Sequence, residues 1–254
     1  MDTMQPAPRH RSAYSARAKL GLIVPPTNTV NEAEWSLMLP AGVTSHTMRM
    51  ALHADTGSDS GKAVLHRDLD AAMAMLVQAR VDVVAYACTA GSMVNPPESL
   101  PARMAAQSGV PAVTTAAAIV AALHSMGLRR LAVATPYHDA LNEHEQHFLT
   151  ACGFEVLSLR GLGIGAAGPA DYPRIAETPL ADVAAHARAA MVPGADALLI
   201  CCTDFPTLPL IAGLEAECGV PVITSNTATL WATLKAARIP DAITDAGKLL
   251  AQAR

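Results

Sequence analysis

The feature of this sequence that most constrains its fold is an internal repeat. An apolar run ends in Cys-Thr at residues 83–89 in the first half and at residues 197–203 in the second half. Each Cys-Thr is followed by Gly-Val-Pro, at residues 109–111 and 219–221, which leads into β-branched and hydroxyl side chains. Two copies of one pattern predict two similar folding units, and such units normally pack about a pseudo-twofold axis.

Apolar runs alternate with amphipathic segments along the chain. Residues 19–25 and 81–87 are nearly uninterrupted apolar runs, which are typical of buried parallel strands. Residues 62–80 between them have apolar side chains at a helical period. Strand alternating with helix predicts the α/β class. We therefore expect two similar parallel-sheet α/β domains related by a pseudo-twofold axis, with the active site in the cleft between them.

The repeat also suggests domain boundaries. Residues 1–17 carry three arginines but no apolar segment, so we expect a mobile N-terminal tail rather than a secretion signal. The first domain is predicted to comprise residues 18–115 together with residues 226–254, and the second to comprise residues 116–225. Residues 162–170 are rich in glycine and alanine and are the best candidate for a mobile flap.

Composition excludes several classes of partner. The net charge is −4 and there is no basic stripe, which argues against nucleic acid. No apolar run reaches the length of about 18 residues that a membrane span needs. An odd number of cysteines, five, without a secretion signal favours reduced thiols in the cytoplasm. We expect a cytoplasmic homo-oligomer that binds a small carboxylate.

Cys88 and Cys202 are the leading catalytic candidates because they occupy the same place in both repeats. Each ends a predicted strand before a helix, where backbone N–H groups lower the pKa of a thiol. A thiolate can remove a C–H proton or add to an electron-poor alkene, and an opposing thiol can return a proton. Cys201 should face the other side of its strand and pack in the core. The alternative is that both cysteines merely fill the core.

Polar groups at the predicted strand ends could hold carboxylates. In parallel sheets ligands bind outside the carboxyl ends of the strands, and there the sequence offers hydroxyls, an amide and backbone N–H groups but no arginine. A carboxylate at Asp204 would repel an anionic substrate unless it is turned away or orients a neighbour. The substrate-binding candidates are Pro26, Thr27, Asn28, Thr89, Ala90, Tyr137, Thr203 and Asp204, and Thr115 and Ser225 are further hydroxyl donors.

Metal and dinucleotide sites are not expected. His138, His144 and His147 do not match the spacing of a tight metal signature, and their helix should present them to solvent. The glycines at 161–165 lack the Gly-x-Gly-x-x-Gly fingerprint between a strand and a helix. We therefore expect no cofactor.

Several of these motifs resemble one protein family. Over residues 19–237 the chain resembles the aspartate/glutamate racemase superfamily, within it the branch of maleate cis-trans isomerases and arylmalonate decarboxylases. Residues 20–29 are similar to the opening of maleate isomerases, which implies that Asn28 binds a substrate carboxylate. Residues 85–88 are similar to their nucleophilic cysteine motif and residues 134–137 to their substrate-binding tyrosine motif. Cys202 falls at their proton-donating cysteine.

The resemblance implies a cofactor-independent isomerase that acts on a small (di)carboxylate, most similar to maleate isomerase. An amino-acid or hydantoin-type racemase and an arylmalonate decarboxylase-like enzyme are the enzymatic alternatives. Decarboxylases of the branch keep only the second cysteine, so Cys88 argues against simple decarboxylation. Residues 162–167 lack the second-half asparagine of maleate isomerases and are closer to the decarboxylases there. A carboxylate-binding or redox-sensing protein, with thiols of ordinary pKa, is the non-enzymatic alternative.

Overall fold

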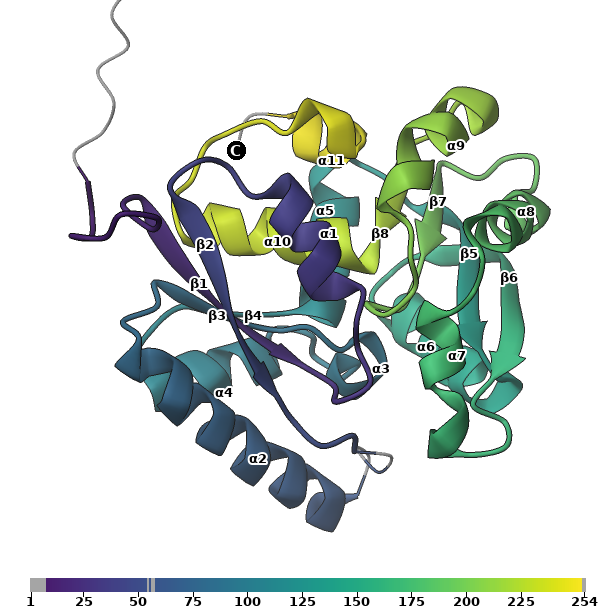
Figure 1. Cartoon of the computed structure of the whole chain (residues 1–254). Coiled ribbons are helices and arrows are strands. Elements are labelled where there is room, and N and C mark those ends of the chain that lie inside the picture. Colours follow the sequence, from purple (N-terminus) through teal and green to yellow (C-terminus); the bar gives the residue numbers. More distant parts are fainter. Residues whose placement is uncertain (1–7, 54, 56–57, 253–254) are drawn as a thin grey trace, which may run out of the picture.

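Two four-stranded sheets, both entirely parallel, form the scaffold of the molecule (Figure 1). The computed structural model describes residues 8–53, 55 and 58–252. The first sheet has the order β2-β1-β3-β4 and the second the order β6-β5-β7-β8, which is the same topology repeated. The strands are β1 (Ala18–Val24), β2 (Val43–Arg49), β3 (Val83–Tyr86), β4 (Ala112–Thr114), β5 (Arg130–Tyr137), β6 (Glu155–Ile164), β7 (Ala197–Ile200) and β8 (Val222–Thr224). The expectation of two parallel-sheet α/β domains is confirmed.

The inner strands are buried because their sequences are apolar without interruption. Every residue of β3 and of β7 is buried. Corresponding registers recur in the two sheets, since Leu20 pairs with Val83 in the first and Leu131 with Ala197 in the second. The Cys-Thr pairs at 88–89 and 202–203 follow these strands and therefore lie at the carboxyl edge of each sheet.

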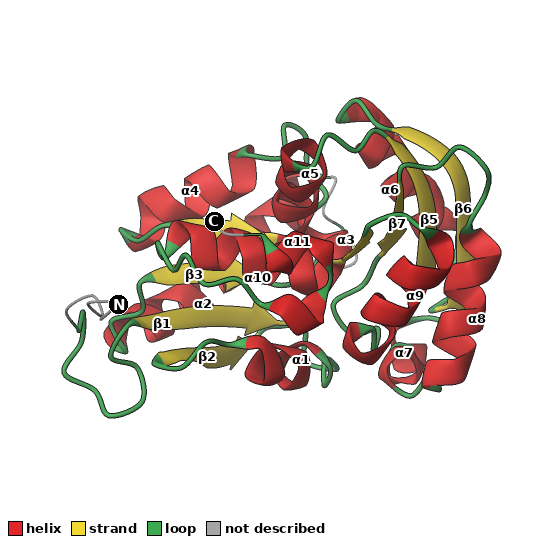
Figure 2. Ribbon diagram, turned by 90° about the horizontal axis from the view of Figure 1, so that it is seen from above, coloured by secondary structure: helices red, strands yellow, loops and turns green. Residues whose placement is uncertain are grey.

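Helices cover both sheets. They are α1 (Asn31–Met38), α2 (Asp59–Gln78), α3 (Thr89–Ser92), α4 (Ser99–Ser108), α5 (Thr115–Ser125), α6 (Asp139–Ala151), α7 (Pro173–Ala176), α8 (Leu180–Ala190), α9 (Ile211–Cys218), α10 (Ser225–Ala236) and α11 (Lys248–Ala251). On the first sheet, Leu69 of α2 and Met104 of α4 share a core with Ile23. On the second sheet, α8 and α9 lie side by side, and Val183 and Leu214 share a core with Leu198 (Figure 2).

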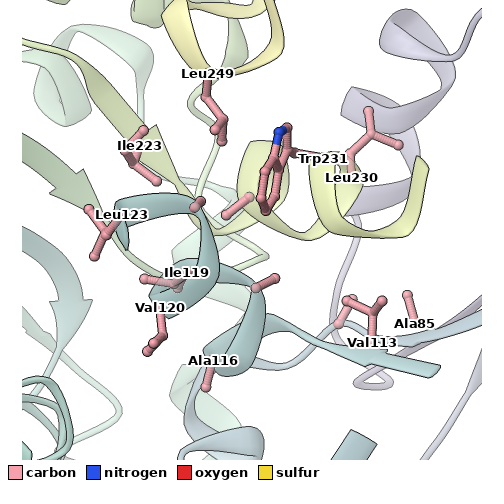
Figure 3. Packing of buried hydrophobic residues seen from close by; sticks show 14 of the residues in the cluster. Ala85, Val113, Ala116, Ile119, Val120, Leu123, Ile223, Leu230, Trp231 and Leu249 are labelled. Atoms are coloured by element: carbon pink, nitrogen blue, oxygen red, sulfur yellow. The ribbon is translucent and has the colours of Figure 1, made fainter. Parts of the chain in front are cut away.

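Helices α5 and α10 join the two sheets through the largest core cluster. Ile119 and Leu123 of α5 pack in one cluster with Leu230 and Trp231 of α10 (Figure 3). Helix α10 begins directly after β8 of the second sheet, yet it contacts β3 and β4 of the first. Helix α5 begins directly after β4 and contacts β8. The domain boundaries at 115/116 and 225/226 and the pseudo-twofold axis stay predictions.

The described part of the predicted N-terminal tail makes specific contacts with the first sheet. Arg9 and His10 both pair with Asp82, and the hydroxyls of Ser15 and Thr44 lie 2.8 Å apart. Residues 1–7 of that tail lie outside the described residues. Within the described ranges, no helix is both long and apolar enough to cross a bilayer.

The glycine-rich segment after residue 160 differs from its expected structure. A flap was expected at 162–170, but β6 continues to Ile164 and Pro169–Asp171 forms a short 3-10 helix. A side chain at Gly161 would overlap the carbonyl oxygen of Tyr137. The glycine therefore lets β6 run close beside β5.

Candidate active site

Most of the predicted site residues line one cavity of about 620 Å³, and they come from the segments that follow β1, β3 and β7 and from the end of β5. Both candidate cysteines line it. Seven of the eight substrate-binding candidates line it as well: Thr27, Asn28, Thr89, Ala90, Tyr137, Thr203 and Asp204. The eighth, Pro26, is exposed and is not among the lining residues, where its neighbour Pro25 is found instead.

Cys88 lies in a turn that supplies two hydrogen-bond donors to its sulfur. The residue caps the N-terminus of α3, and the backbone N–H of Gly91 donates to its Sγ over 3.4 Å. The Tyr86 hydroxyl donates to the same sulfur. Burial raises the pKa of the Cys88 thiol, and both donors counteract this by stabilising the thiolate.

Cys202 has an unusual backbone conformation, and the carboxylate of Asp204 acts on its thiol. Its φ of +89° lies in the left-handed region, which costs a non-glycine residue about 1–3 kcal/mol and is often found at functional sites. The Tyr137 hydroxyl and the backbone N–H of Asp204 donate to its sulfur. Burial, and next the Asp204 carboxylate, raise the pKa of the Cys202 thiol far above its ordinary value.

The two thiols are therefore suited to different tasks. Cys88 is buried and Cys202 is partly buried, and both have a tyrosine donor, but the carboxylate beside Cys202 favours its protonated form. The arrangement favours Cys88 as the thiolate and Cys202 as the proton donor. Cys201 faces the other way, as predicted: it is fully buried and its thiol donates to Glu145 in the core.

Hydrogen bonds link the two Cys-Thr turns directly. Thr203 Oγ1 donates to the carbonyl of Ala87, the residue before Cys88, over 3.0 Å. In the other direction, the Thr89 hydroxyl lies 2.8 Å from the Ser225 hydroxyl, which accepts from the Cys202 backbone N–H at 3.0 Å. The position of each cysteine thus depends on the turn that carries the other.

Asn28 is held by its side-chain amide. Its Nδ2 donates to Thr203 Oγ1 over 3.0 Å, and its Oδ1 accepts from the backbone N–H groups of Val30 and Asn31 at 3.2 and 3.0 Å. An asparagine Nδ2 has two hydrogens, so one N–H remains to donate to a ligand. This geometry fits the expected carboxylate contact.

Asp204 is turned toward backbone donors. Its Oδ1 accepts from the N–H of Thr29 at 2.8 Å and of Val30 at 3.3 Å. Burial raises the pKa of Asp204 to about 6, while these two N–H groups and Arg49 lower it. Of the two possibilities left by the sequence, a direct substrate contact and an orienting role, this geometry favours the second.

Several lining residues were not foreseen. Tyr86 ends β3 two positions before Cys88, and in extended backbone residues two positions apart lie on the same face, so it could have been found. His138 and His144 were expected to face solvent, but both line the cavity, although His144 is also exposed. An apolar wall is formed by Leu52, Leu141, Tyr172 and Ile175.

The cavity lining contains carboxylates but no permanent cation. Among the described residues that line it there is no lysine or arginine. The same described ranges contain no group of three or more His, Cys, Asp or Glu side chains that could hold a metal ion. Hydroxyl and amide groups therefore share the polar lining with the carboxylates of Asp55 and Asp204 and the imidazoles of His53, His138 and His144.

Comparison with known proteins identifies relatives over most of the chain. The sequence profile of the arylmalonate decarboxylase family matches residues 20–250. The maleate isomerase of Nocardia farcinica is 32% identical over 247 residues, which cover 92% of this chain and 96% of that protein. A crystal structure of the maleate isomerase Iso from Pseudomonas putida S16 with maleate has a TM-score of 0.82 and 27% identity, and it covers 92% of this chain and 97% of that one.

A second solved structure is of chemical interest. It is a cysteine-to-serine variant of the Nocardia farcinica maleate cis-trans isomerase with a covalently bound succinylcysteine intermediate. Its TM-score is 0.82 at 30% identity, and the match covers 93% of this chain and 99% of that one.

Proposed function

The chain belongs to the arylmalonate decarboxylase family, in the branch of the aspartate/glutamate racemase superfamily that includes maleate isomerases, and we propose that it is a cofactor-independent maleate cis-trans isomerase. The observation that carries this proposal is the pair of free cysteines, Cys88 and Cys202, which line one cavity in unlike electrostatic surroundings. Because Cys88 is present as well as Cys202, the chain differs from a decarboxylase, which would need only one thiol.

The reaction uses both sulfurs. The Cys88 thiolate adds to one alkene carbon of maleate and forms a C–S bond, while the alkene electron pair takes the proton of Cys202 at the neighbouring carbon. The former double bond is now single and rotates. The Cys202 thiolate then removes the proton it gave, the C–S bond breaks with its electrons returning to Cys88, and fumarate is formed.

The relative's chemistry supports this scheme. A succinylcysteine is the adduct that results when a thiol adds across the double bond of maleate or fumarate, and such an adduct is bound in the Nocardia farcinica variant. In this chain the second N–H of Asn28 and the backbone N–H groups of Thr89, Ala90 and Thr203 would hold the two carboxylates, and the Tyr137 hydroxyl, which donates to Cys202, would lie beside them.

The test is direct. Protein incubated with maleate should produce fumarate, measured by proton NMR. Cys88→Ser should abolish turnover, and Cys202→Ser should accumulate protein heavier by one maleic acid, because addition no longer leads to elimination. Cys218→Ser, a change at the end of α9, should retain activity. Absence of fumarate with the wild-type protein would overturn the proposal.

A second candidate is suggested by the apolar wall. The cavity of about 620 Å³ is larger than maleate needs, and Leu52, Leu141, Tyr172 and Ile175 line it, which favours a bulkier carboxylate as the substrate of a racemase or a decarboxylase. Deuterium incorporation at the α-carbon of aryl or amino acids would reveal racemisation, and loss of carbon dioxide from an arylmalonate would reveal decarboxylation.

A further inference from the structure

We propose that Asp204 is a positioning residue: its carboxylate clasps the loop that carries Asn28 to the loop that carries Cys202 and so fixes the carboxylate-binding side of the cavity. The inference rests on the proposed function, because it takes Asn28 as a substrate contact.

The clasp connects segments from different sheets. Asp204 lies in the loop after β7 of the second sheet, two residues beyond Cys202. Thr29 and Val30 lie in the loop after β1 of the first sheet and donate their backbone N–H groups to Asp204 Oδ1 at 2.8 and 3.3 Å. A carboxylate accepts such bonds more strongly than a neutral oxygen does.

The clasp reaches Asn28 through a shared donor. The N–H of Val30 lies 3.2 Å from Asn28 Oδ1 and 3.3 Å from Asp204 Oδ1, so both side chains converge on one backbone group. On its other side Asn28 donates to Thr203, the neighbour of Asp204. Release of residues 29–30 would therefore loosen the orientation of the Asn28 amide.

Other contacts limit the electrostatic penalty of a carboxylate here. Arg49 of β2 donates to the Asn28 carbonyl at 2.8 Å. Its positive charge lowers the pKa of Asp204 and so favours the ionised carboxylate over the protonated form. Asp204 lines the cavity but uses Oδ1 to accept from backbone amides. A carboxylate at this place can thus hold the loop without itself binding an anionic substrate.

Glu34 provides a matched control because it makes a similar clasp outside the cavity. It lies on α1 of the first half and accepts from the backbone N–H groups of Thr207 and Leu208, in the segment after β7, at 2.6 and 2.7 Å. Asn226 Nδ2 donates to its other oxygen at 2.7 Å. Glu34 is not among the residues that line the cavity.

The experiment compares Asp204→Ala, Asp204→Asn and Glu34→Ala in the full-length protein. Amide hydrogen exchange is measured for the peptides that contain residues 29–30 and 207–208. Asp204→Ala should speed exchange at 29–30 alone, Asp204→Asn should retain most of the protection because its Oδ1 still accepts, and Glu34→Ala should speed exchange at 207–208 alone.

Kinetics with maleate provide the second measurement. Asp204→Ala should lower kcat/KM about tenfold, the effect of losing roughly one well-made hydrogen bond to the substrate, whereas Asp204→Asn should stay within about threefold and Glu34→Ala close to wild type. Unchanged exchange at 29–30 in Asp204→Ala would overturn the clasp. Faster exchange with unchanged kcat/KM would overturn the positioning role. A wild-type protein without maleate turnover would refute the proposed function, and the exchange data would still decide whether the clasp exists.

Discussion

At the scale of single residues, each cavity cysteine has its own tyrosine donor. Tyr86 donates to Cys88 and Tyr137 to Cys202. We expect Tyr86→Phe to raise the pKa of the Cys88 thiol by about one unit, because a hydrogen bond to a charged group is worth about 1.5–3 kcal/mol. The pH dependence of Cys88 alkylation by iodoacetamide, followed by peptide mass spectrometry, measures this pKa.

The matched control for that change is Tyr172→Phe, which removes a hydroxyl from the wall of the same cavity. It should leave the alkylation profile of Cys88 where it is in the wild type. If Tyr86→Phe also leaves that profile unmoved, the Tyr86 hydroxyl does not stabilise the thiolate.

The residue scale also shows what sequence could and could not predict about the site. The repeated Cys-Thr pairs located both thiols, because strand ends in parallel sheets converge. The role of Asp204 was not predictable, since its donors are the backbone N–H groups of Thr29 and Val30, which lie in the loop after β1 and have no side-chain signature. Pro26 was included through its motif, but the backbone turn exposes it.

At the scale of elements, α3 is a single helical turn that brings a backbone N–H to the Cys88 sulfur. A Cβ at Gly91 would overlap the Tyr86 hydroxyl and lie 3.1 Å from Cys88 Sγ. Gly91→Ala should therefore displace the thiol and lower kcat/KM for maleate by up to about 100-fold, as misplacement of a reacting group by about 1 Å can do. Steady-state kinetics and the alkylation rate of Cys88 check this.

Gly213→Ala is the appropriate comparison for the glycine substitution. Gly213 lies within α9, and a Cβ there meets nothing within 4 Å. This variant should keep full activity and gain up to about 1 kcal/mol in the free energy of unfolding, because alanine favours a helix over glycine. Equal activities of the two variants would show that the space around Gly91 is not critical.

The extents of the elements were predicted unevenly, for physical reasons. Uninterrupted apolar runs identified β3 and β7, since burial on both faces requires them. The one-turn helix α3 has no apolar period to detect, as it is only four residues long. The glycines and alanines of residues 162–170 suggested a flap, whereas β6 extends to Ile164 and uses Gly161 for close approach to β5.

At the scale of the whole molecule, the arrangement depends on two helices that join the sheets. Helix α10 follows the second sheet and packs on the first, while α5 follows the first and contacts the second. Sequence periodicity can indicate a buried helix but not which sheet covers it. Helices α5 and α10 bury apolar and polar side chains on most sides, so neither has a single apolar face that would identify its partner. The common topology of the sheets was predictable from the repeat. Of the crossed packing, only one half was predicted, because residues 226–254 were assigned to the first domain.

Global stability should depend on pH through a buried carboxyl behind the site. Glu145 of α6 is 1% exposed, and burial raises its pKa from 4.5 to about 7. Between those pH values the folded protein keeps a proton that the unfolded chain has released, so the free energy of unfolding falls as the pH rises through this window. The loss amounts to roughly 3 kcal/mol, at about 1.4 kcal/mol for each unit of pKa.

Glu145→Gln removes this proton-linked part and still leaves an oxygen to accept from the Cys201 thiol. Urea unfolding at pH 5 and pH 8 should therefore show a smaller decrease in stability for Glu145→Gln than for the wild type. Asp204, whose pKa is raised to about 6, adds a decrease of the same sign to both proteins, so the difference between them isolates Glu145. Glu143→Gln, at an exposed position of the same helix, should retain the wild-type dependence. Parallel curves for the wild type and Glu145→Gln would mean that Glu145 is not the group that couples folding to pH.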